Sequence, residues 1–232
     1  MTSISTLDIS KMLRSEEDFD EMFKKVLPQS AVLRAGKITN RKNRLLSLSG
    51  ELLARYLLHK TFGLSVNEIE FSYTEKGKPF IPGRNDVHFN ISHSGNTVAA
   101  AVAQTRIGID IEHFRKINFR IAERYFTPAE LFYIHTQEEP EKTRNFFEIW
   151  TIKESFLKAI GTGLTRSLSS FEVTNIAGKF MISGKGSENF RVNAYRLKGY
   201  QLAVCVENDD SPKKIHEVNF NELFGSVIGS AH

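Results

Sequence analysis

The sequence predicts an α+β protein built from two similar halves in tandem, each with a long helix packed on a small antiparallel sheet. Residues 45–62 form an apolar stretch of helical character that ends at Gly63, and residues 146–160 form a second, followed by Gly163. Short β-rich runs follow each stretch, as expected when a helix covers an antiparallel sheet. The spacing of the two stretches, near 100 residues, indicates an internal repeat.

The runs that follow the two helical stretches match in order and in residue type. Aromatic and glycine-containing segments come first, and apolar, β-rich runs come last. The first half contains residues 71–73, 77–81, 88–91 and 98–102, and the second contains residues 171–173, 178–182, 189–192 and 202–206. We therefore divide the chain into residues 1–106 and 107–232 and expect the functional site in the crevice between them.

Composition is that of an ordinary globular protein. A chain of 232 residues with 41% apolar and 25% charged content can bury a sizeable core. No signal peptide is evident, and no run approaches the roughly 18 apolar residues of a membrane span, so we expect a cytoplasmic protein without a membrane partner. The single cysteine, Cys205, lies in an apolar run and is expected to be a buried hydrophobe.

The charge distribution favours an acidic partner. The net charge is +4, and residues 22–50 contain several cations but no aspartate or glutamate. Such a run suits a polyphosphate or a nucleic acid, and a solvated basic face is an equally good interpretation.

An acidic strand and a charged helix carry the clearest chemical signal. In residues 107–112 isoleucines alternate with Gly108, Asp110 and Glu112, so both carboxylates share one face of a strand. Glu154 and Lys158 lie one turn apart on the second helix, where a plain helical ion pair is the simpler interpretation. Three carboxylates and a lysine together indicate phosphate chemistry with a divalent metal ion.

Lys153 falls inside the apolar arc of the same helix. A lysine there either extends to the surface or faces a buried phosphate. Two further segments offer groups to a phosphate: Ser92 and His93 precede a turn, and Lys78 lies beside a glycine that permits close backbone approach. Neither segment is specific alone.

The connection between the halves contains a helix start and a basic, apolar segment. Thr127, Pro128 and Glu130 form a capping pattern that predicts a helix beginning near residue 128. Ahead of it, residues 113–126 mix cations with aromatic and aliphatic side chains. This segment is either a loop packed on the core or a docking surface whose cations are Arg115, Lys116, Arg120 and Arg124.

In combination and in this order, the motifs resemble those of the Sfp-type 4'-phosphopantetheinyl transferases. The resemblance runs from the basic segment around Arg44 through residues 77–82, 88–95, 107–112 and 150–158 to residues 161–164. The length is similar to that of the monomeric pseudo-dimer branch rather than the half-length trimeric holo-acyl-carrier-protein synthases. We therefore expect a monomer.

The resemblance implies transfer of the 4'-phosphopantetheine arm of coenzyme A to a serine of an apo carrier protein, with release of 3',5'-ADP. The carriers would be the acidic acyl, peptidyl or aryl carriers of fatty-acid, polyketide or nonribosomal-peptide synthesis. Mg²⁺, or Mn²⁺ in its place, would be held by Asp110, Glu112 and Glu154. Glu154 would accept the serine proton, Lys158 would stabilise the pyrophosphate or the leaving group, and Lys153 would assist.

The same resemblance implies the groups that bind coenzyme A. They are Arg44, Lys78, Ser92, His93, Asp110 and Lys158, with looser matches at Lys37 and Arg41. The carrier would dock on Arg115, Lys116, Arg120 and Arg124.

Two other functions use parts of the same pattern. A metal-dependent phosphodiesterase or nuclease would need the three carboxylates, but it leaves the phosphate-binding segments without a role. A non-enzymatic nucleic-acid-binding module would use residues 22–50, but the paired acids would repel a phosphate backbone. We therefore expect no nucleic-acid partner.

Overall fold

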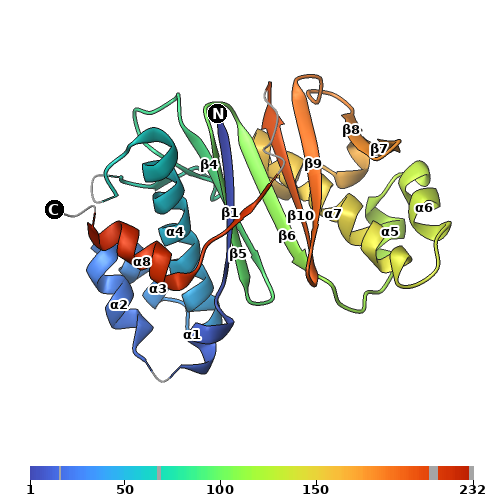
Figure 1. The fold of residues 1–232 in the computed structure, drawn as a ribbon. Helices are drawn as coiled ribbons and strands as arrows, with labels where there is room; N and C mark the ends of the chain where they lie inside the picture. The colour runs from blue at the N-terminus through green and yellow to red at the C-terminus, as the bar shows by residue number, and fades with distance from the viewer. Residues whose placement is uncertain (16, 67–68, 209–213, 230–232) are drawn as a thin grey trace.

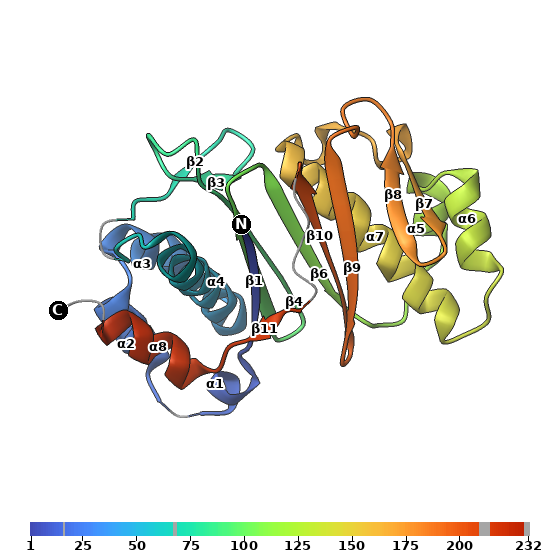
Figure 2. The same cartoon turned by 45° about the horizontal axis from the view of Figure 1, so that its top comes forward.

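The computed structural model describes all residues except 16, 67–68, 209–213 and 230–232, and it has four layers in the order helix, sheet, sheet, helix (Figure 1). The helix α4 (Arg41–Phe62) covers the outer face of the first sheet, and α7 (Glu141–Ile160) covers the outer face of the second. Figure 2 shows the two sheets side by side in the middle of the molecule, with the helices outside.

Both sheets have the same core of three antiparallel strands. The first sheet contains, in spatial order, β11 (His216–Glu217), β1 (Thr2–Asp8), β5 (Thr97–Ala103) and β4 (His88–Ser94), and the second contains β6 (Ile107–His113), β10 (Tyr200–Glu207) and β9 (Phe190–Leu197). Because β1 pairs with β5 as β6 pairs with β10, the two halves repeat one topology. The predicted α+β fold of two similar halves is confirmed.

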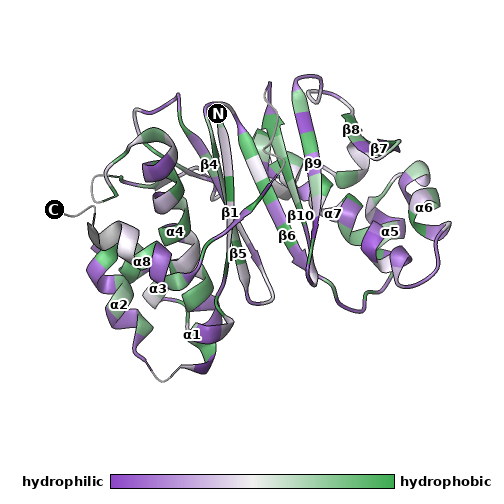
Figure 3. Ribbon diagram, viewed as in Figure 1, coloured by the Kyte–Doolittle hydropathy of each residue, from purple (hydrophilic) through white to green (hydrophobic). Residues whose placement is uncertain are grey.

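Alternating side chains on the central strands separate an apolar core under α4, a second between the sheets and two clusters under α7. On β5, Val98 and Val102 face α4, whereas Ala99 and Ala101 face the second sheet, where their small side chains let the sheets approach. The isoleucines of β6 fill the same space between the sheets. Hydrophobic residues accordingly dominate the central strands in Figure 3. The opposite face of β6, which carries Asp110, is thereby turned toward α7.

A glycine ends each of the two long helices. α4 ends at Gly63, as the sequence predicts, and α7 ends at Gly161, two residues before the predicted Gly163; both glycines are in the left-handed conformation, with φ of 68° and 72°. The predicted capping box is also formed: Thr127 caps α6 (Pro128–His135), and Glu130 bonds back to it. Five shorter helices complete the described α-helices, namely α1 (Ser10–Arg14), α2 (Phe19–Val26), α3 (Gln29–Gly36), α5 (Arg120–Tyr125) and α8 (Phe220–Gly229), and two 3₁₀ helices span Gly163–Thr165 and Leu168–Ser170.

The predicted β-rich runs form strands, but only the last two runs of each half join its large sheet. The first two runs of each half form hairpins of their own, β2 (Ser72–Tyr73) with β3 (Pro79–Phe80), and β7 (Glu172–Ile176) with β8 (Lys179–Ser183). The strand that completes each sheet comes from elsewhere in the chain: β1 for the first sheet and β6 for the second.

The C-terminal tail packs on the first half, although it belongs by sequence to the proposed second half, residues 107–232. β11 pairs with β1 in parallel, and α8 packs on α2 and α4 of the first half. The apolar side chains of Val218, Leu223 and Phe224 enter the first core, because they find partners there such as Phe23, whose ring lies 5.3 Å from that of Phe224. Residues 209–213 and 230–232 of the tail lie outside the described residues.

Across the described residues, no helix combines the length and the apolar composition that crossing a membrane requires.

Candidate active site

Gly108 allows α7 to lie directly against β6. A Cβ at this position would lie 2.0 Å from the carbonyl oxygen of Ser155 and 2.4 Å from the backbone nitrogen of Ala159. No side chain fits at such distances, so the close approach requires glycine. It places the turns of α7 that carry Glu154 and Lys158 beside the acidic face of β6.

Asp110 and Lys158 form the centre of this contact. The Lys158 ammonium donates to Asp110 Oδ1 at 2.6 Å and to Ser92 Oγ at 3.0 Å, and Ser92 Oγ donates to the same Oδ1 at 3.0 Å. Asp110 is 5% exposed, and this burial raises the pKa of its carboxyl, an effect that the Lys158 cation opposes. In the described structure Lys158 therefore pairs with Asp110 rather than forming the simple helical ion pair with Glu154.

The second oxygen of Asp110 is available for a ligand. Oδ2 is buried and has no hydrogen-bond partner among the described residues. Buried carboxylate oxygens are normally paired, so an orphaned one beside a cleft indicates a missing cation or donor.

Glu112 and Glu154 are the two other predicted metal ligands. Glu112 Oε2 accepts hydrogen bonds from Ser94 Oγ at 2.8 Å and from Arg115 Nη1 at 2.7 Å. Glu154 is half-buried, and burial, followed by the negative charges of Asp110 and Glu112, raises its pKa. No three metal-ligating side chains in the described ranges already form a cluster that could hold a metal ion. The acids are thus close enough to repel one another but do not form a finished ligand shell.

Side chains of β4 connect the two sheets at the site. Asn90 Oδ1 accepts from Ile109 N at 2.9 Å, and Ser92 Oγ accepts from Ile111 N at 3.3 Å. Ser94 Oγ accepts from His113 N at 3.1 Å. These bonds satisfy the outer backbone of β6, an edge strand, in the place of a neighbouring strand.

A cavity of about 280 Å³ lies between the halves beside the ion pair. Its walls come from both halves: residues 76–79, Asn90 and Ile91 from the first, and Glu154, Leu157, Lys158, Gly161 and Gly163 from the second. This cavity therefore lies at the interface of the two halves.

Lys78 lines this cavity but uses its ammonium to fasten the end of α7. Nζ donates to the carbonyl oxygens of Ile107, Lys158 and Ala159 at 3.2, 2.6 and 2.9 Å. Burial, and then the Arg106 cation, lower the pKa of Lys78 to about 8. The ammonium thus binds carbonyls near the negative end of the helix dipole, and its expected contact with a coenzyme A phosphate is not the role seen here.

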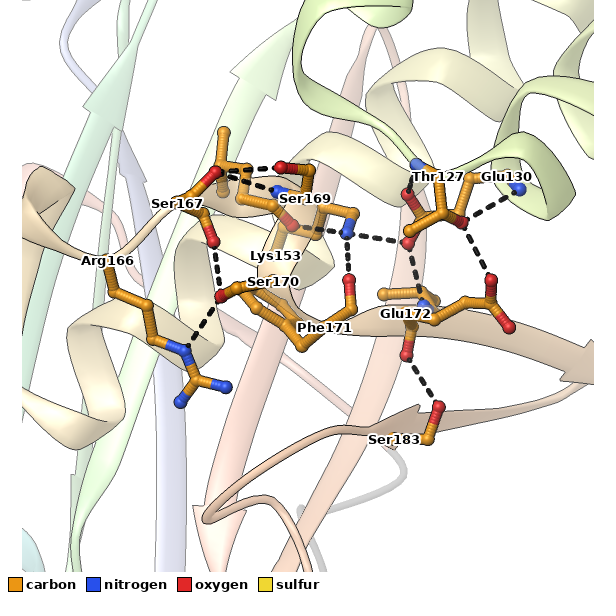
Figure 4. A network of polar contacts seen from close by, with 12 residues as sticks. Thr127, Glu130, Lys153, Arg166, Ser167, Ser169, Ser170, Phe171, Glu172 and Ser183 are labelled. Carbon is orange, nitrogen blue, oxygen red and sulfur yellow. Dashed lines mark hydrogen bonds and ion pairs between the residues drawn. The ribbon is translucent and has the colours of Figure 1, made fainter.

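Lys153 does not belong to the site, which corrects the prediction that it assists catalysis. Its side chain is fully buried and forms an ion pair with Glu130 at 2.7 Å (Figure 4). It also donates to the carbonyl oxygens of Leu168 and Phe171 at 2.8 and 2.7 Å. The apolar arc predicted its burial correctly, but the partner is a carboxylate of α6 rather than a phosphate.

The predicted basic contacts of the first half lie outside the cavity wall. Arg44 pairs with Asp20 at 2.9 Å, and Arg41 donates to backbone carbonyls of α1. Lys37 is the C-terminal cap of α3. Among the described residues that line the cavity, none of these three appears.

His93 and the predicted docking cations have different surroundings. His93 keeps solvent contact at the end of β4, although partial desolvation and then the Lys158 cation lower the pKa of its imidazole. Arg115 pairs with Glu112, as described above. The other three docking cations, Lys116, Arg120 and Arg124, are exposed.

Three residues of the site were not predicted: Asn90, Ser94 and Gly108. The first two alternate with Ser92 on one face of β4, opposite the apolar Phe89 and Ile91. A strand with one polar face inside a protein indicates a polar neighbour, so this alternation was the available signal.

Two family models match consecutive parts of the chain. The 4'-phosphopantetheinyl transferase superfamily matches residues 106–205, and the family of 4'-phosphopantetheinyl transferase N-terminal domains matches residues 14–105.

Curated relatives share the family and most of the length. The 4'-phosphopantetheinyl transferase Sfp of Bacillus subtilis is 38% identical over 180 residues, which cover 76% of this chain and 80% of that protein. The 4'-phosphopantetheinyl transferase gsp of Aneurinibacillus migulanus is 36% identical over 172 residues, 73% of this chain and 71% of that protein.

Among solved structures, a holo-(acyl-carrier-protein) synthase from Bacillus anthracis in complex with CoA (3',5'-ADP) aligns with a TM-score of 0.41 and 25% identity. It covers 45% of this chain and 97% of that chain. From the family models and the curated relatives together, the chain belongs to the 4'-phosphopantetheinyl transferase superfamily.

Proposed function

We propose that this protein transfers the 4'-phosphopantetheine arm of coenzyme A to a serine of an apo carrier protein and releases 3',5'-ADP. The observation that carries the proposal is the ion pair between buried Asp110 and partly exposed Lys158, with Glu154 beside it, at a cavity walled by both halves. A nuclease or phosphodiesterase would need the acids alone, whereas the named relatives favour transfer.

Asp110, Glu112 and Glu154 are the residues that would hold Mg²⁺, or Mn²⁺ in its place. The unpaired Oδ2 of Asp110 and the raised pKa of Glu154 both fit a cation among these oxygens. When bound, the ion neutralises the charge of the coenzyme A pyrophosphate. Hard oxygen donors without histidine or cysteine suit these ions better than zinc.

Glu154 is the group that would accept the proton of the carrier serine. Its half-buried carboxylate lines the cavity between the halves, where the carrier serine would have to meet coenzyme A. The serine oxygen forms a bond to the β-phosphorus as the bond to the 3',5'-ADP oxygen breaks. Lys158, held by Asp110 and Ser92, would stabilise the charge that develops on the leaving group.

Coenzyme A phosphates would lie along His93 and the basic residues of the first half, Arg44, Arg41 and Lys37. Arg44 and Arg41 bond in this structure to Asp20 and to backbone carbonyls, so binding would require them to exchange partners. We expect His93→Ala to weaken coenzyme A affinity with a smaller effect on turnover, measured by calorimetry and by kinetics.

The exposed cations Lys116, Arg120 and Arg124 would dock the acidic carrier. Lys116 precedes α5, and Arg120 and Arg124 lie on it. Ile121 of α5 and Phe132 of α6 are 40% and 73% exposed. Cations with exposed apolar side chains suit an acidic, amphipathic partner. We propose that the enzyme works as a monomer, since both walls of the cavity come from one chain.

Incubation with Mg²⁺, coenzyme A and an apo carrier tests the proposal directly. Mass spectrometry should show the carrier gaining one phosphopantetheine arm, EDTA should abolish the gain, and Mg²⁺ should restore it. Hydrolysis of coenzyme A without a gain in carrier mass would favour the phosphodiesterase. Undiminished transfer after thorough chelation would remove the metal from the proposal.

A further inference from the structure

Two serines of β4 hold the two acids of β6 in the same way. Ser92 donates to one oxygen of Asp110 and accepts from the backbone N–H of the next residue, Ile111. The Lys158 cation bonds to the same Asp110 oxygen, Oδ1, and leaves Oδ2 without a partner among the described residues.

Ser94 repeats this arrangement one step further along both strands. It donates to Glu112 Oε2 at 2.8 Å and accepts from the backbone N–H of the next residue, His113, at 3.1 Å. A cation again bonds to the same oxygen: Arg115 Nη1 lies 2.7 Å from Oε2. In the described structure both hydrogen bonds to this carboxylate reach Oε2, so Oε1 is the oxygen left for a ligand.

The turn that carries Ser94 is fixed to the second sheet. The Tyr200 hydroxyl accepts a hydrogen bond from Asn96 N at 3.2 Å, and the Tyr200 ring lies against His113, with 4.9 Å between centroids. A Cβ at Gly95 would lie 2.8 Å from that hydroxyl. Ser94 therefore has little freedom to move away from Glu112.

We infer that Ser94 is a positioning residue that orients Glu112 for the metal ion, an inference that rests on the proposed function. Ser94 does not touch the substrate in this role. It holds one oxygen of Glu112 and thereby presents the other, as Ser92 and Lys158 do for Asp110. Groups that orient a ligating carboxylate in this way typically change metal affinity by about 10–100-fold when they are lost.

The same geometry gives Arg115 a role at the metal site. Its guanidinium donates to Glu112 and to the His113 carbonyl, and it lies 5.1 Å from the centre of the Phe147 ring. Arg120 and Arg124 have no such contact with the acids among the described residues. Arg115 thus belongs with Ser94 rather than with the docking cations.

The test compares Ser94→Thr with Ser94→Val, two side chains of nearly equal shape that differ in the hydroxyl. Mn²⁺ alone is the probe, titrated by electron paramagnetic resonance without coenzyme A or carrier. We expect Ser94→Val and Ser94→Ala to weaken Mn²⁺ binding about tenfold or more, and Ser94→Thr to remain within about twofold of the wild type.

Ser187→Ala is the matched control, because the Ser187 hydroxyl is equally well bonded, to the Ile182 and Gly184 carbonyls, but lies away from the acids. It should leave Mn²⁺ binding unchanged. Thermal unfolding of each variant identifies any that fails to fold. The Mn²⁺ affinities of Ser94→Thr and Ser94→Val are compared only if both variants are folded.

The possible failures are distinct. A wild type that neither binds Mn²⁺ nor modifies the carrier overturns the proposed function itself. A wild type that does both, with Ser94→Val binding Mn²⁺ as tightly as Ser94→Thr, overturns the role of Ser94 alone. A higher KM for coenzyme A in Ser94→Val, with unchanged Mn²⁺ affinity, would also overturn the role of Ser94, because the serine would then act on the substrate.

Discussion

The helices α4 and α7 occupy matching places in the two halves, and each carries a buried cation about two turns before the glycine that ends it. In α4 this residue is Arg55, which is 1% exposed, and in α7 it is Lys153. Each cation pairs with a buried glutamate, Glu51 for Arg55 and Glu130 for Lys153.

Both cations also fasten the chain that follows their helix. Arg55 donates to the carbonyls of Val66 and Ile69, in the way that Lys153 donates to those of Leu168 and Phe171. An aromatic ring covers each cation, 4.5 Å from Arg55 and 4.4 Å from Lys153. This arrangement of a buried cation, its glutamate and two carbonyls is present in both halves. Because only the second half has the acidic site, we infer that the arrangement stabilises the fold.

The next positions along the two helices differ, and there the halves differ in chemistry. Glu154 follows Lys153, whereas Tyr56 follows Arg55 and donates to Glu222 of the C-terminal tail at 2.8 Å. On the strands, Asp110 lies opposite Ala203, the fourth residue of β10, whereas Ser5 lies opposite Ala100, the fourth residue of β5. The comparison teaches that the buried cations repeated in both helices are structural, whereas Asp110 and Glu154, which the first half does not repeat, belong to the site.

The largest expected effect is the loss of stability when the buried cation of either helix is removed. Lys153→Met leaves the Glu130 carboxylate buried without its cation, which should cost about 3–5 kcal/mol of the free energy of unfolding. Arg55→Met should cost less, because Glu51 keeps its ion pair with Arg34, and urea unfolding measures both. If Lys153→Met were as stable as the wild type but had lost turnover, Lys153 would act in catalysis, and the structural role that the comparison assigns to it would be wrong.

Lys158 and Lys60 provide the next contrast, because each lies one turn before the end of its helix. We expect Lys158→Ala to lower turnover about a hundredfold, as does loss of a key electrostatic group, with Asp110→Ala and Glu154→Gln falling at least as far. Lys60→Ala should leave turnover within about twofold, as expected for an exposed side chain. The measurement is the rate of carrier modification under saturating coenzyme A. Equal losses in Lys158→Ala and Lys60→Ala would contradict the assignment of the chemistry to the second half.

A smaller effect is expected at the docking cations. Reversing Arg120 and Arg124 to glutamate should raise the apparent KM for the carrier several-fold, because exposed charges act mainly on encounter, and added salt should shrink the difference. Coenzyme A affinity should stay unchanged by calorimetry. If it fell as much as carrier affinity, this segment would belong to the nucleotide site.

The smallest effect concerns two tyrosines, one in each half. Burial, and then a hydrogen bond to glutamate, raise the pKa of Tyr56 to about 12, and the same causes raise that of Tyr133 to about 12. Above pH of about 10 the unfolded chain releases these protons while the folded protein keeps them, so stability should fall as the pH rises toward 12. Tyr56→Phe and Tyr133→Phe should each flatten this decline in urea unfolding.

The sequence predicted the parts of this protein that depend on local patterns. Alternation placed Asp110 and Glu112 on one face, and the capping residues located the start of α6. The identity of partners across the fold was less predictable. The helix pattern placed Lys153 among apolar residues, but only the packing of α6 against α7 shows that Glu130 meets it. The same holds for β1, whose mixed polar and apolar residues give no strand signal before β5 is known.

The return of the tail to the first half has a consequence for synthesis. The core under α4 is closed by Val218, Leu223 and Phe224, and among the described residues β11 is the strand that pairs with the outer edge of β1. A ribosome makes the first half well before these residues, because domains emerge from the N-terminus onward. Until residue 224 has emerged, the nascent chain exposes an apolar surface and an unpaired strand edge, both of which bind chaperones or other chains. The two apolar clusters under α7 contain no residue of the tail, so this part of the second half does not wait for residue 224.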